Sequence, residues 1–287
     1  MAFDSSSGSL TWKTVLPKEE RAFQLFSKPI VSGNNIFLGS ADKNVYCLDL
    51  KSGDVKWKVE LDDWVRSSPV VMDGKLIVAT CVGTAYAIQL TGKQPEIVWK
   101  SKASTHGIYA DLREYNGSLY VSSSDYYLVS LNPTNGEINW KTSIFESLVD
   151  EHGNRILADL TGGGPDYQAG TTIADGIVYF GSPRFVYAVD VETGKEVWKF
   201  ETRGQICGAP AVANGKVFFG QQGGTNFFYC VDAKTGSLEW KKPLKWIWAS
   251  PNVKDGKVYM AAVELNPPFG GQPKPKLLIV CKLMSCL

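Results

Sequence analysis

The chain has 287 residues, a length that repeat-built β folds reach as one domain, so the length alone does not require two domains. Thirty basic and 29 acidic residues give a formal charge of +1, which argues against nonspecific nucleic-acid binding and against a polybasic membrane patch. Hydrophobic residues make up 44% of the chain, as in ordinary globular proteins, but no apolar stretch approaches the roughly 18 to 20 residues that span a bilayer. The first residues, MAFDSSSG, lack the apolar core of a signal peptide, so we expect no export signal in the chain as written.

One sequence motif recurs from the first residues onward. In each copy an apolar stretch leads to an Asp or Asn, a Gly follows four residues later, and a Trp follows four residues after the Gly. Five copies end at Trp12, Trp57, Trp140, Trp198 and Trp240. A sixth copy, ending at Trp99, is degraded, because Gln89 replaces the Asp and the interval from Gly92 to the Trp is longer. Consecutive tryptophans are 45, 42, 41, 58 and 42 residues apart, which indicates a repeat architecture.

Each period has the same interior. A stretch of small residues with a Pro, such as SSPVV, precedes an Asp-Gly or Asn-Gly turn and a strand such as residues 75–80 (KLIVAT). A further strand, such as residues 44–50 (NVYCLDL), leads into the Gly and the Trp. Alternating apolar residues bounded by tight-turn pairs are typical of short antiparallel strands. We therefore predict an all-β fold with four strands per period, which is the blade of a β-propeller.

These repeats resemble those of the quinoprotein-type, or PQQ-like, β-propeller family. The resemblance rests on D-x-x-T-G-x-x-x-W, as in VDVETGKEVW, together with S-P-x-x-x-D-G-K-V-Y, as in SPNVKDGKVY, and it covers nearly the whole chain. The family includes quinone-dependent alcohol dehydrogenases and a BamB-like branch of outer-membrane assembly lipoproteins. It implies blades in which the Pro-containing strand is innermost and the Trp-bearing strand is outermost.

Six four-stranded antiparallel blades are visible, and we predict that residues 1–287 form a single propeller domain. The chain begins inside a third strand at Ala2, whereas residues 276–287 supply a third strand with no Gly and Trp after it. We therefore expect the N-terminal strand, residues 1–13, to complete the last blade, which closes the ring and removes exposed sheet edges. The alternative is that the chain is a fragment of a seven- or eight-bladed ring.

The six motif tryptophans invite a role in ligand stacking, because indole rings bind flat ligands. However, a residue that recurs at the same position in every blade is expected to serve a purpose common to all blades, such as packing. We therefore predict that they are structural and pack against the neighbouring blade. The motif glycines permit a positive φ in the turn between the third and fourth strands.

The cysteines and histidines show no metal-binding or catalytic pattern. Cys47, Cys230 and Cys281 share one register of the third strand in different blades, too far apart for disulfides, so we predict that they are buried core residues. No Cys-x-x-Cys or Cys/His spacing indicates zinc. His106 and His152 fall in connections between blades, without a recognisable Ser or Cys partner, although such partners are assembled in space. We predict no catalytic residue and no metal site.

The connections between strands differ on the two faces of the predicted propeller. The Asp-Gly turns and the motif Gly turns keep their length, whereas the connections between blades and from second to third strand vary, and these emerge on one face. The largest additions are residues 142–170 and the Pro/Gly-rich residues 264–276. Binding sites are usually formed by variable loops that a rigid scaffold holds in position. We therefore predict that a protein partner or a small molecule binds on this variable face, with filler loops as the alternative.

Aligning the inner strands on the Pro predicts which side chains line an axial channel. The candidate ligand-binding residues are Arg66, Tyr109, Asp111, Arg113, Gln168, Trp248 and Asn252. The third blade is anomalous, because it carries an acid and a base two residues apart where other blades have small or apolar residues. These charges predict a small-ligand site. The alternative is a solvated ion pair that fills the channel.

The sequence therefore predicts a noncatalytic propeller, a protein-interaction scaffold or a small-ligand-binding module, that resembles the BamB-like branch. The alternative is a quinone (PQQ)-dependent dehydrogenase or a truncated domain of one. Dehydrogenases of the family have an adjacent cysteine pair beside the quinone and a bound Ca²⁺. No two cysteines are adjacent in this chain, so we expect neither PQQ nor calcium. The resemblance implies a periplasmic or extracellular protein, and we expect no nucleic-acid partner and no transmembrane segment.

Overall fold

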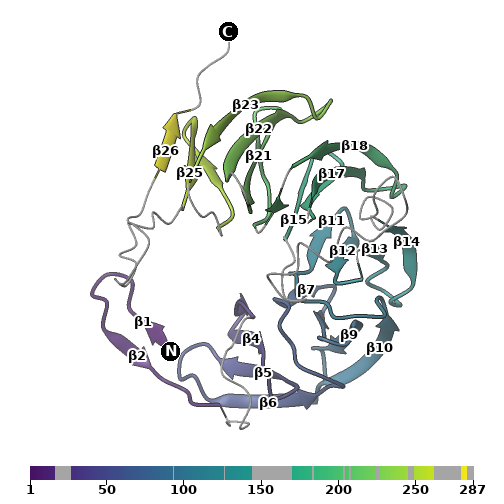
Figure 1. The fold of residues 1–287 in the computed structure, drawn as a ribbon. Coiled ribbons are helices and arrows are strands. Elements are labelled where there is room, and N and C mark those ends of the chain that lie inside the picture. The colour runs from purple at the N-terminus through teal and green to yellow at the C-terminus, as the bar shows by residue number, and fades with distance from the viewer. Residues whose placement is uncertain are drawn as a thin grey trace, which may run out of the picture. The chain divides into compact units, whose positions relative to one another are not determined.

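The computed structural model describes the chain at residues 1–16, 27–92, 94–125, 127–143, 170–182, 184–202, 204–206, 208–223, 226–244, 249–261 and 279–282 (Figure 1). Every regular element within these residues is a β-strand, as the sequence predicts. The chain divides into two compact units. The first unit contains residues 1–125 and 129–139, and the second contains residues 126–128 and 140–287.

The first unit is built from antiparallel sheets whose strands follow one another in chain order. A two-stranded sheet pairs β1 (Ala2–Phe3) with β2 (Leu10–Trp12). One four-stranded sheet contains β3 (Ile30–Ser32), β4 (Asn35–Gly39), β5 (Asn44–Asp49) and β6 (Val55–Glu60). The next contains β7 (Val70–Met72), β8 (Lys75–Ala79), β9 (Thr84–Gln89) and β10 (Glu96–Lys102). A third, with β11 (Arg113–Tyr115), β12 (Ser118–Ser123), β13 (Tyr127–Leu131) and β14 (Ile138–Ser143), extends across the boundary between the units.

The second unit continues the same pattern. One sheet contains β15 (Thr171–Ala174), β16 (Ile177–Gly181), β17 (Phe185–Asp190) and β18 (Glu196–Glu201). The next contains β19 (Gln205–Ile206), β20 (Ala211–Ala213), β21 (Lys216–Gln222), β22 (Phe227–Asp232) and β23 (Leu238–Pro243), with β19 and β20 both paired to β21. The last described sheet has three strands, β24 (Asn252–Lys254), β25 (Lys257–Met260) and β26 (Ile279–Lys282). That β2 completes this last sheet stays a prediction.

The predicted order of strands within each sheet is confirmed, with one correction. Pro69, Pro210 and Pro251 do not lie in the inner strands but immediately before them, because β7, β20 and β24 each begin at the residue that follows the Pro. A proline has no N–H to donate to the neighbouring strand, so it is suited to the entry of a strand and not to its interior.

Side-chain capping explains why the repeat motif begins with Asp and continues with Thr-Gly. In the turn between β22 and β23, Asp232 Oδ1 accepts hydrogen bonds from the backbone N–H of Lys234 at 3.1 Å and from the N–H and hydroxyl of Thr235, both at 2.8 Å. The hydrogen bonds from Thr235 hold the pKa of the Asp232 carboxyl below its usual value. Gly236 completes the turn with a φ of 71°, a conformation that costs glycine little.

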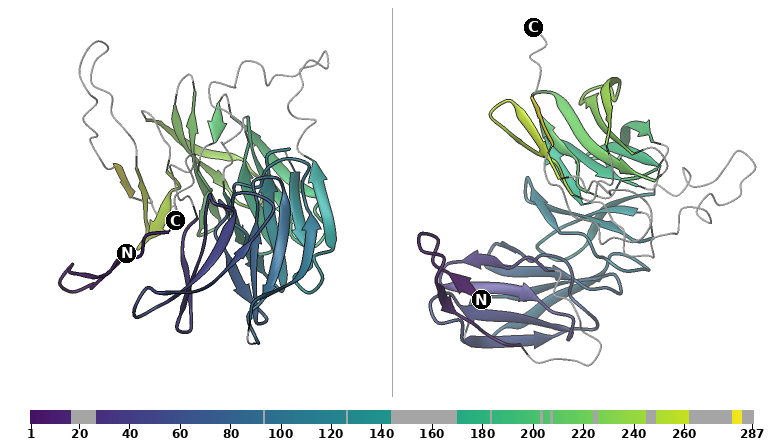
Figure 2. Two further views of the ribbon diagram at one scale, coloured as in Figure 1. Left: turned by 90° about the horizontal axis from the view of Figure 1, so that it is seen from below. Right: turned by 60° about the vertical axis from the view of Figure 1, so that its left-hand side comes forward.

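The hydrophobic core lies between neighbouring sheets, which stack face to face (Figure 2). In the first unit, Phe37 and Val45 of one sheet pack with Leu76 and Ile88 of the next. In the second unit, Trp198 packs with residues of β21 and β22. The middle strands of the sheets, such as β8, β9, β21 and β22, are mostly buried, whereas the outermost strands β6, β10, β14, β18 and β23 are largely exposed.

Two of the register-sharing cysteines lie where the sequence predicts. Cys47 in β5 and Cys230 in β22 are both buried, and they belong to different sheets. Burial raises the pKa of the Cys47 thiol to about 11, so this thiol is unreactive at neutral pH. Within the described residues, no helix long and apolar enough to cross a membrane is present.

Candidate functional site

A row of hydrogen bonds joins the entries of successive inner strands. In the first unit, the backbone N–H of Lys28 donates to Ser68 Oγ at 3.1 Å, and the N–H of Ser68 donates to Asp111 Oδ1 at 3.2 Å. In the second unit, the N–H of Ala209 donates to Ser250 Oγ at 2.9 Å. All five residues occupy one repeat position, two residues before the strand begins. This position links adjacent sheets, a role that the sequence alone did not predict.

Asp111 is the charged member of this row. Its Oδ2 lies 3.2 Å from Lys28 Nζ and 4.0 Å from the Arg113 guanidinium, and its side chain is 20% exposed. Burial acts to raise the pKa of the carboxyl, but the hydrogen bonds from Ser68 and the nearby Lys28 ammonium outweigh it, so the pKa is lowered from its ordinary value. Asp111 is therefore ionised at neutral pH, between two cationic side chains.

We expect Asp111→Asn to destabilise the protein by about 1 kcal/mol, because the amide leaves the Lys28 and Arg113 charges without their carboxylate. The double variant Asp111→Asn, Arg113→Gln should recover part of this loss, since it also removes one cation. Thermal unfolding followed by circular dichroism measures both effects. Equal melting temperatures for wild type and both variants would mean that these side chains are simply solvated.

A second group of side chains comes from the connections between β6 and β7 and between β10 and β11. The Arg66 guanidinium carbon lies 5.0 Å from the centre of the Tyr109 ring, within range of a cation–π interaction. Trp64, two residues before Arg66, accepts a hydrogen bond from the N–H of Cys81 on its backbone carbonyl at 2.8 Å. A Cβ at Gly107 would lie 2.5 Å from the Tyr109 ring and 2.7 Å from the Cys81 carbonyl, so only glycine fits there. These segments therefore form one packed surface.

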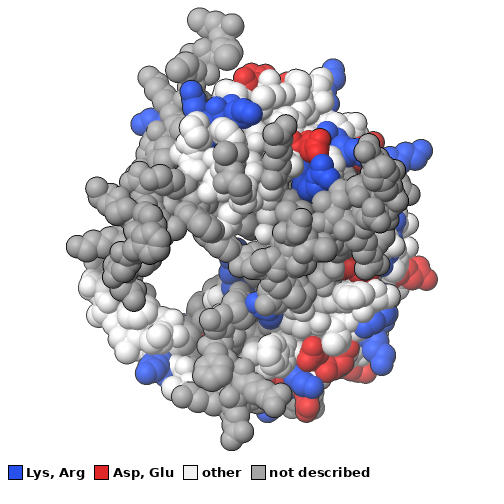
Figure 3. All heavy atoms as spheres, in the orientation of Figure 1, with Lys and Arg blue, Asp and Glu red and all other residues white. Residues whose placement is uncertain are grey.

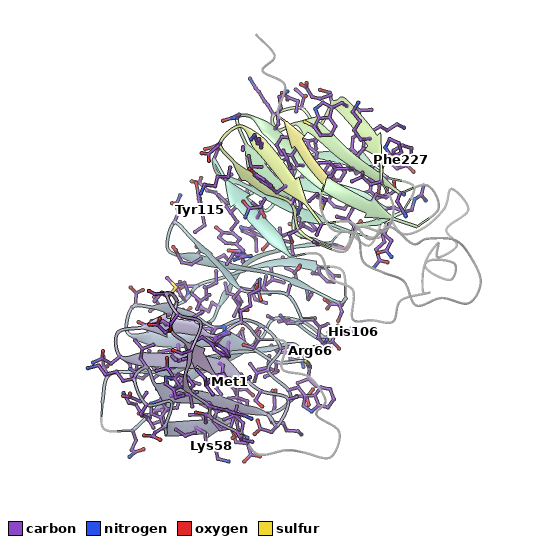
Figure 4. All side chains as sticks on the ribbon, turned by 90° about the vertical axis from the view of Figure 1, so that its left-hand side faces the viewer. Met1, Lys58, Arg66, His106, Tyr115 and Phe227 are labelled. Atoms are coloured by element: carbon purple, nitrogen blue, oxygen red, sulfur yellow. The ribbon has the colours of Figure 1, made fainter. Side chains whose placement is uncertain are left out.

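Trp64, Arg66 and Tyr109 are each neither fully buried nor fully exposed. We call these three residues the aromatic–arginine cluster. Figure 4 shows that Arg66 and His106 lie on the same side of the first unit, whereas Lys58 lies on the outer strand β6. The cluster belongs to the connections between β6 and β7 and between β10 and β11, which are among those predicted to form the variable face.

The connection between β10 and β11 also holds the imidazole ring of His106 in place. Thr105 Oγ1 donates to Asp125 Oδ2 at 2.9 Å and lies 3.0 Å from His106 Nδ1. Because the single hydroxyl hydrogen of Thr105 goes to Asp125, its oxygen accepts from an Nδ1–H on His106. Burial raises the pKa of Asp125, but hydrogen bonds from Ser123, Ser104 and Thr105 outweigh it and lower the pKa to about 2. The arrangement holds the Nδ1 side of an exposed His106 side chain.

The structure places some of the candidate ligand-binding residues together. In the first unit, Arg66 contacts Tyr109, and Asp111 lies beside Arg113. Asn252 is the exposed first residue of β24 in the second unit. Gln168, Trp248 and His152 lie outside the described residues, as do residues 144–169 of the first long addition and all of residues 264–276. A ligand site that combines all seven residues stays a prediction.

Four motif tryptophans lie over the motif glycine of the next repeat. A Cβ on Gly136 would lie 2.5 Å from the Trp99 ring, one on Gly194 2.6 Å from Trp140, and one on Gly236 2.7 Å from Trp198, while one on Gly53 would overlap the Trp12 ring. Each indole Nε1 donates to a backbone carbonyl of the same turn, with distances of 3.2, 2.9, 3.0 and 2.9 Å from Trp12, Trp99, Trp140 and Trp198. The motif glycine is therefore needed for space as well as for φ.

The other two motif tryptophans contact aromatic rings of their own sheets. The Trp57 ring centre lies 5.7 Å from that of Phe37, and the Trp240 ring centre lies 5.7 Å from that of Phe228. Trp57 precedes the degraded repeat, whose Gly92 has no Trp atom near the position of a Cβ. The degraded motif thus coincides with a missing Trp–Gly contact.

Calcium in proteins is held by several oxygen ligands, most of them carboxylates. Within them, no group of three or more His, Cys, Asp or Glu side chains could hold a metal ion. Asp111, the carboxylate in the row of hydrogen bonds described above, already lies next to Lys28, and the positive charge of Lys28 opposes binding of a divalent cation. On the face seen in Figure 3, basic and acidic groups of the described residues are interspersed.

Comparisons with known proteins agree with this architecture. The profile of the family described as outer membrane protein assembly factor BamB matches residues 1–163, 148–228 and 185–266. BamB of Legionella pneumophila (strain Paris) is 22% identical over 210 residues, which cover 67% of this chain and 47% of that protein. Quinohemoprotein alcohol dehydrogenase ADH-IIG of Pseudomonas putida is 27% identical over 173 residues, which cover 56% of this chain and 22% of that protein. The chain thus spans less than half the length of these two relatives.

A solved structure shows the same fold. BamB from Moraxella catarrhalis has a TM-score of 0.61 to this chain at 14% sequence identity, and the similarity covers 80% of this chain and 79% of that one. At this level of identity the likeness concerns the fold alone. It confirms the predicted all-β propeller of four-stranded antiparallel blades.

Proposed function

The chain belongs to the BamB family of PQQ-like β-propellers, and from this membership we propose that it is a noncatalytic scaffold that binds a protein partner. The observation that carries the proposal is the contact between Arg66 and Tyr109 in the aromatic–arginine cluster, where the guanidinium carbon lies 5.0 Å from the ring centre. Trp, Tyr and Arg are enriched among the few residues that supply most of the binding energy at protein interfaces. Arg66 over Tyr109 is a pair of these residue types.

The partner follows from the family. Relatives of this chain are named as factors in outer-membrane protein assembly. We therefore propose that the cluster binds a protein of that assembly process, in the periplasm or at the outer membrane. A small anionic or polyol ligand beside Asp111 is the other binding mode that this surface would support, and it would use the Lys28 and Arg113 side chains instead.

A binding measurement with an outer-membrane β-barrel precursor tests the proposal. The precursor is diluted from urea onto the immobilised full chain, with an unfolded soluble protein as reference. We expect Arg66→Ala and Tyr109→Ala each to weaken binding about 30-fold, the size of an interface hot spot of about 2 kcal/mol. Lys241→Ala is the matched control, because it removes another cation–π pair, Lys241 with Phe227 at 4.7 Å, on an outer strand. Equal affinities for all variants, or no preference for the precursor, would contradict the proposal.

A quinone-dependent dehydrogenase is the second candidate, because one relative is a quinohemoprotein alcohol dehydrogenase. Alcohol-dependent reduction of a dye after addition of PQQ and Ca²⁺ measures this activity. We expect no turnover above that of the free quinone. Turnover that saturates with the alcohol would favour the dehydrogenase over the scaffold.

A further inference from the structure

Most of the tight turns between the first and second strands of the sheets share one backbone conformation. Five of these turns have a positive φ at both central residues, as two-residue type I′ turns require. Asp fills the first central position at Asp73, Asp175 and Asp255, and Asn fills it at Asn116 and Asn214, each followed by Gly. The chain has one further Asn-Gly pair, Asn135-Gly136, in a motif turn.

Asn-Gly pairs are the sites at which an asparagine side chain can react with its own backbone. The nitrogen of the glycine loses its proton to solvent base and attacks the Asn side-chain carbonyl carbon, so that an N–C bond forms, the C–NH₂ bond breaks and ammonia leaves. Water then opens the resulting five-membered ring to give aspartate or isoaspartate. Glycine favours the reaction because it has no Cβ to hinder the approach, and Asn is accordingly counted among the thermolabile residues.

The three Asn-Gly pairs differ in whether the N–H of the glycine donates a hydrogen bond. The N–H of Gly136 donates to the Asn132 carbonyl at 2.8 Å, and the N–H of Gly117 donates to Glu114 Oε1 at 3.1 Å, so both nitrogens are held away from the reaction. For the N–H of Gly215, no acceptor is found within the described part of the chain. Asn214 and Gly215 are both exposed, so water and base reach them.

From these contacts we infer that Asn214 is a site of spontaneous deamidation in the folded protein, ahead of Asn116 and Asn135. The aspartate product fits the turn, because Asp occupies the same position in three other sheets with a φ of about 50°. The isoaspartate product does not, because it inserts an extra backbone carbon between β20 and β21 and breaks the pairing of Ala213 with Lys216. The site therefore adds one negative charge as the protein ages, and a fraction of molecules also lose the turn.

Peptide mapping by mass spectrometry after incubation at mildly alkaline pH tests the inference. In the folded wild type we expect deamidation at Asn214 to be several-fold faster than at Asn116 or Asn135. In the urea-unfolded chain all three pairs should react at similar rates, because the hydrogen bonds are lost. Asn116 or Asn135 reacting as fast as Asn214 in the folded protein would overturn the inference.

Glu114→Ala supplies the matched variant. It removes the acceptor of the Gly117 N–H without touching Asn116 itself, and Glu114 is exposed, so the fold should persist. We expect this change to accelerate deamidation at Asn116 toward the rate at Asn214, and Asn214 to be unaffected. An unchanged rate at Asn116 would show that hydrogen bonding to the glycine nitrogen does not control the reaction, and the inference would fail.

Discussion

Trp198→Ala should destabilise the protein by about 3 to 5 kcal/mol, the cost of removing a large aromatic from a packed interior. Trp198 is 8% exposed and belongs to the core between two sheets of the second unit. The substitution also removes the hydrogen bond from its indole Nε1 to the Ala233 carbonyl and uncovers Gly236. Urea unfolding followed by circular dichroism measures the loss.

Trp57→Ala is the matched control for this substitution. Trp57 holds the same motif position, but it faces the degraded repeat and covers no motif glycine. We therefore expect Trp57→Ala to cost clearly less than Trp198→Ala. Equal losses would mean that general burial, and not the Trp–Gly contact, stabilises the repeats. A stable Trp198→Ala protein that had lost partner binding would instead assign the motif tryptophans to the binding site.

The strands were predictable because the signals that define them are local. An Asp-Gly pair such as Asp73-Gly74 needs only its own φ angles to set a two-residue turn, and an Asp such as Asp232 caps residues two and three positions later. Alternating apolar residues between such turns then indicate short antiparallel strands, and therefore an all-β fold. The repetition of the motif fixed the strand order within each sheet, which the structure confirms.

The candidate site was less predictable because its contacts join residues far apart in the chain. Aligning the inner strands identified Arg66, Tyr109, Asp111 and Arg113, but the alignment did not reveal that Lys28 supplies a counter-ion to Asp111. It also did not reveal that the row of hydrogen bonds uses the backbone N–H of each preceding repeat. The sequence did hold one signal for this row. Lys28, Ser68 and Asp111 share one aligned position, and the side chains of Ser68 and Asp111 can accept a hydrogen bond from the neighbouring repeat.

Glycines at close approaches are a second feature that sequence reasoning missed. Gly83 lies in the turn between β8 and β9 and has a φ of 87°. Its N–H donates to the Thr80 carbonyl at 3.0 Å, and its carbonyl accepts from the N–H of Ser104 at 3.0 Å. A Cβ at this position would overlap the backbone carbonyls of Ser104 and His106. The glycine therefore lets the connection that carries His106 and Tyr109 lie directly on this turn.

Gly83→Ala should consequently destabilise the protein by about 2 to 6 kcal/mol, from about 1 to 3 kcal/mol of backbone strain and a similar cost of overpacking. Gly74→Ala is the control, because its φ of 70° imposes the same strain while the nearest atom, Thr91 Cγ2, would lie 3.4 Å from the new Cβ. We expect Gly74→Ala to lose only the strain contribution in urea unfolding.

Because the overlap displaces the Ser104–Tyr109 segment, Gly83→Ala should also weaken binding of the β-barrel precursor, whereas Gly74→Ala should not. Equal stabilities for the two variants would contradict the close approach, and an unaltered affinity of folded Gly83→Ala would separate this segment from the binding surface.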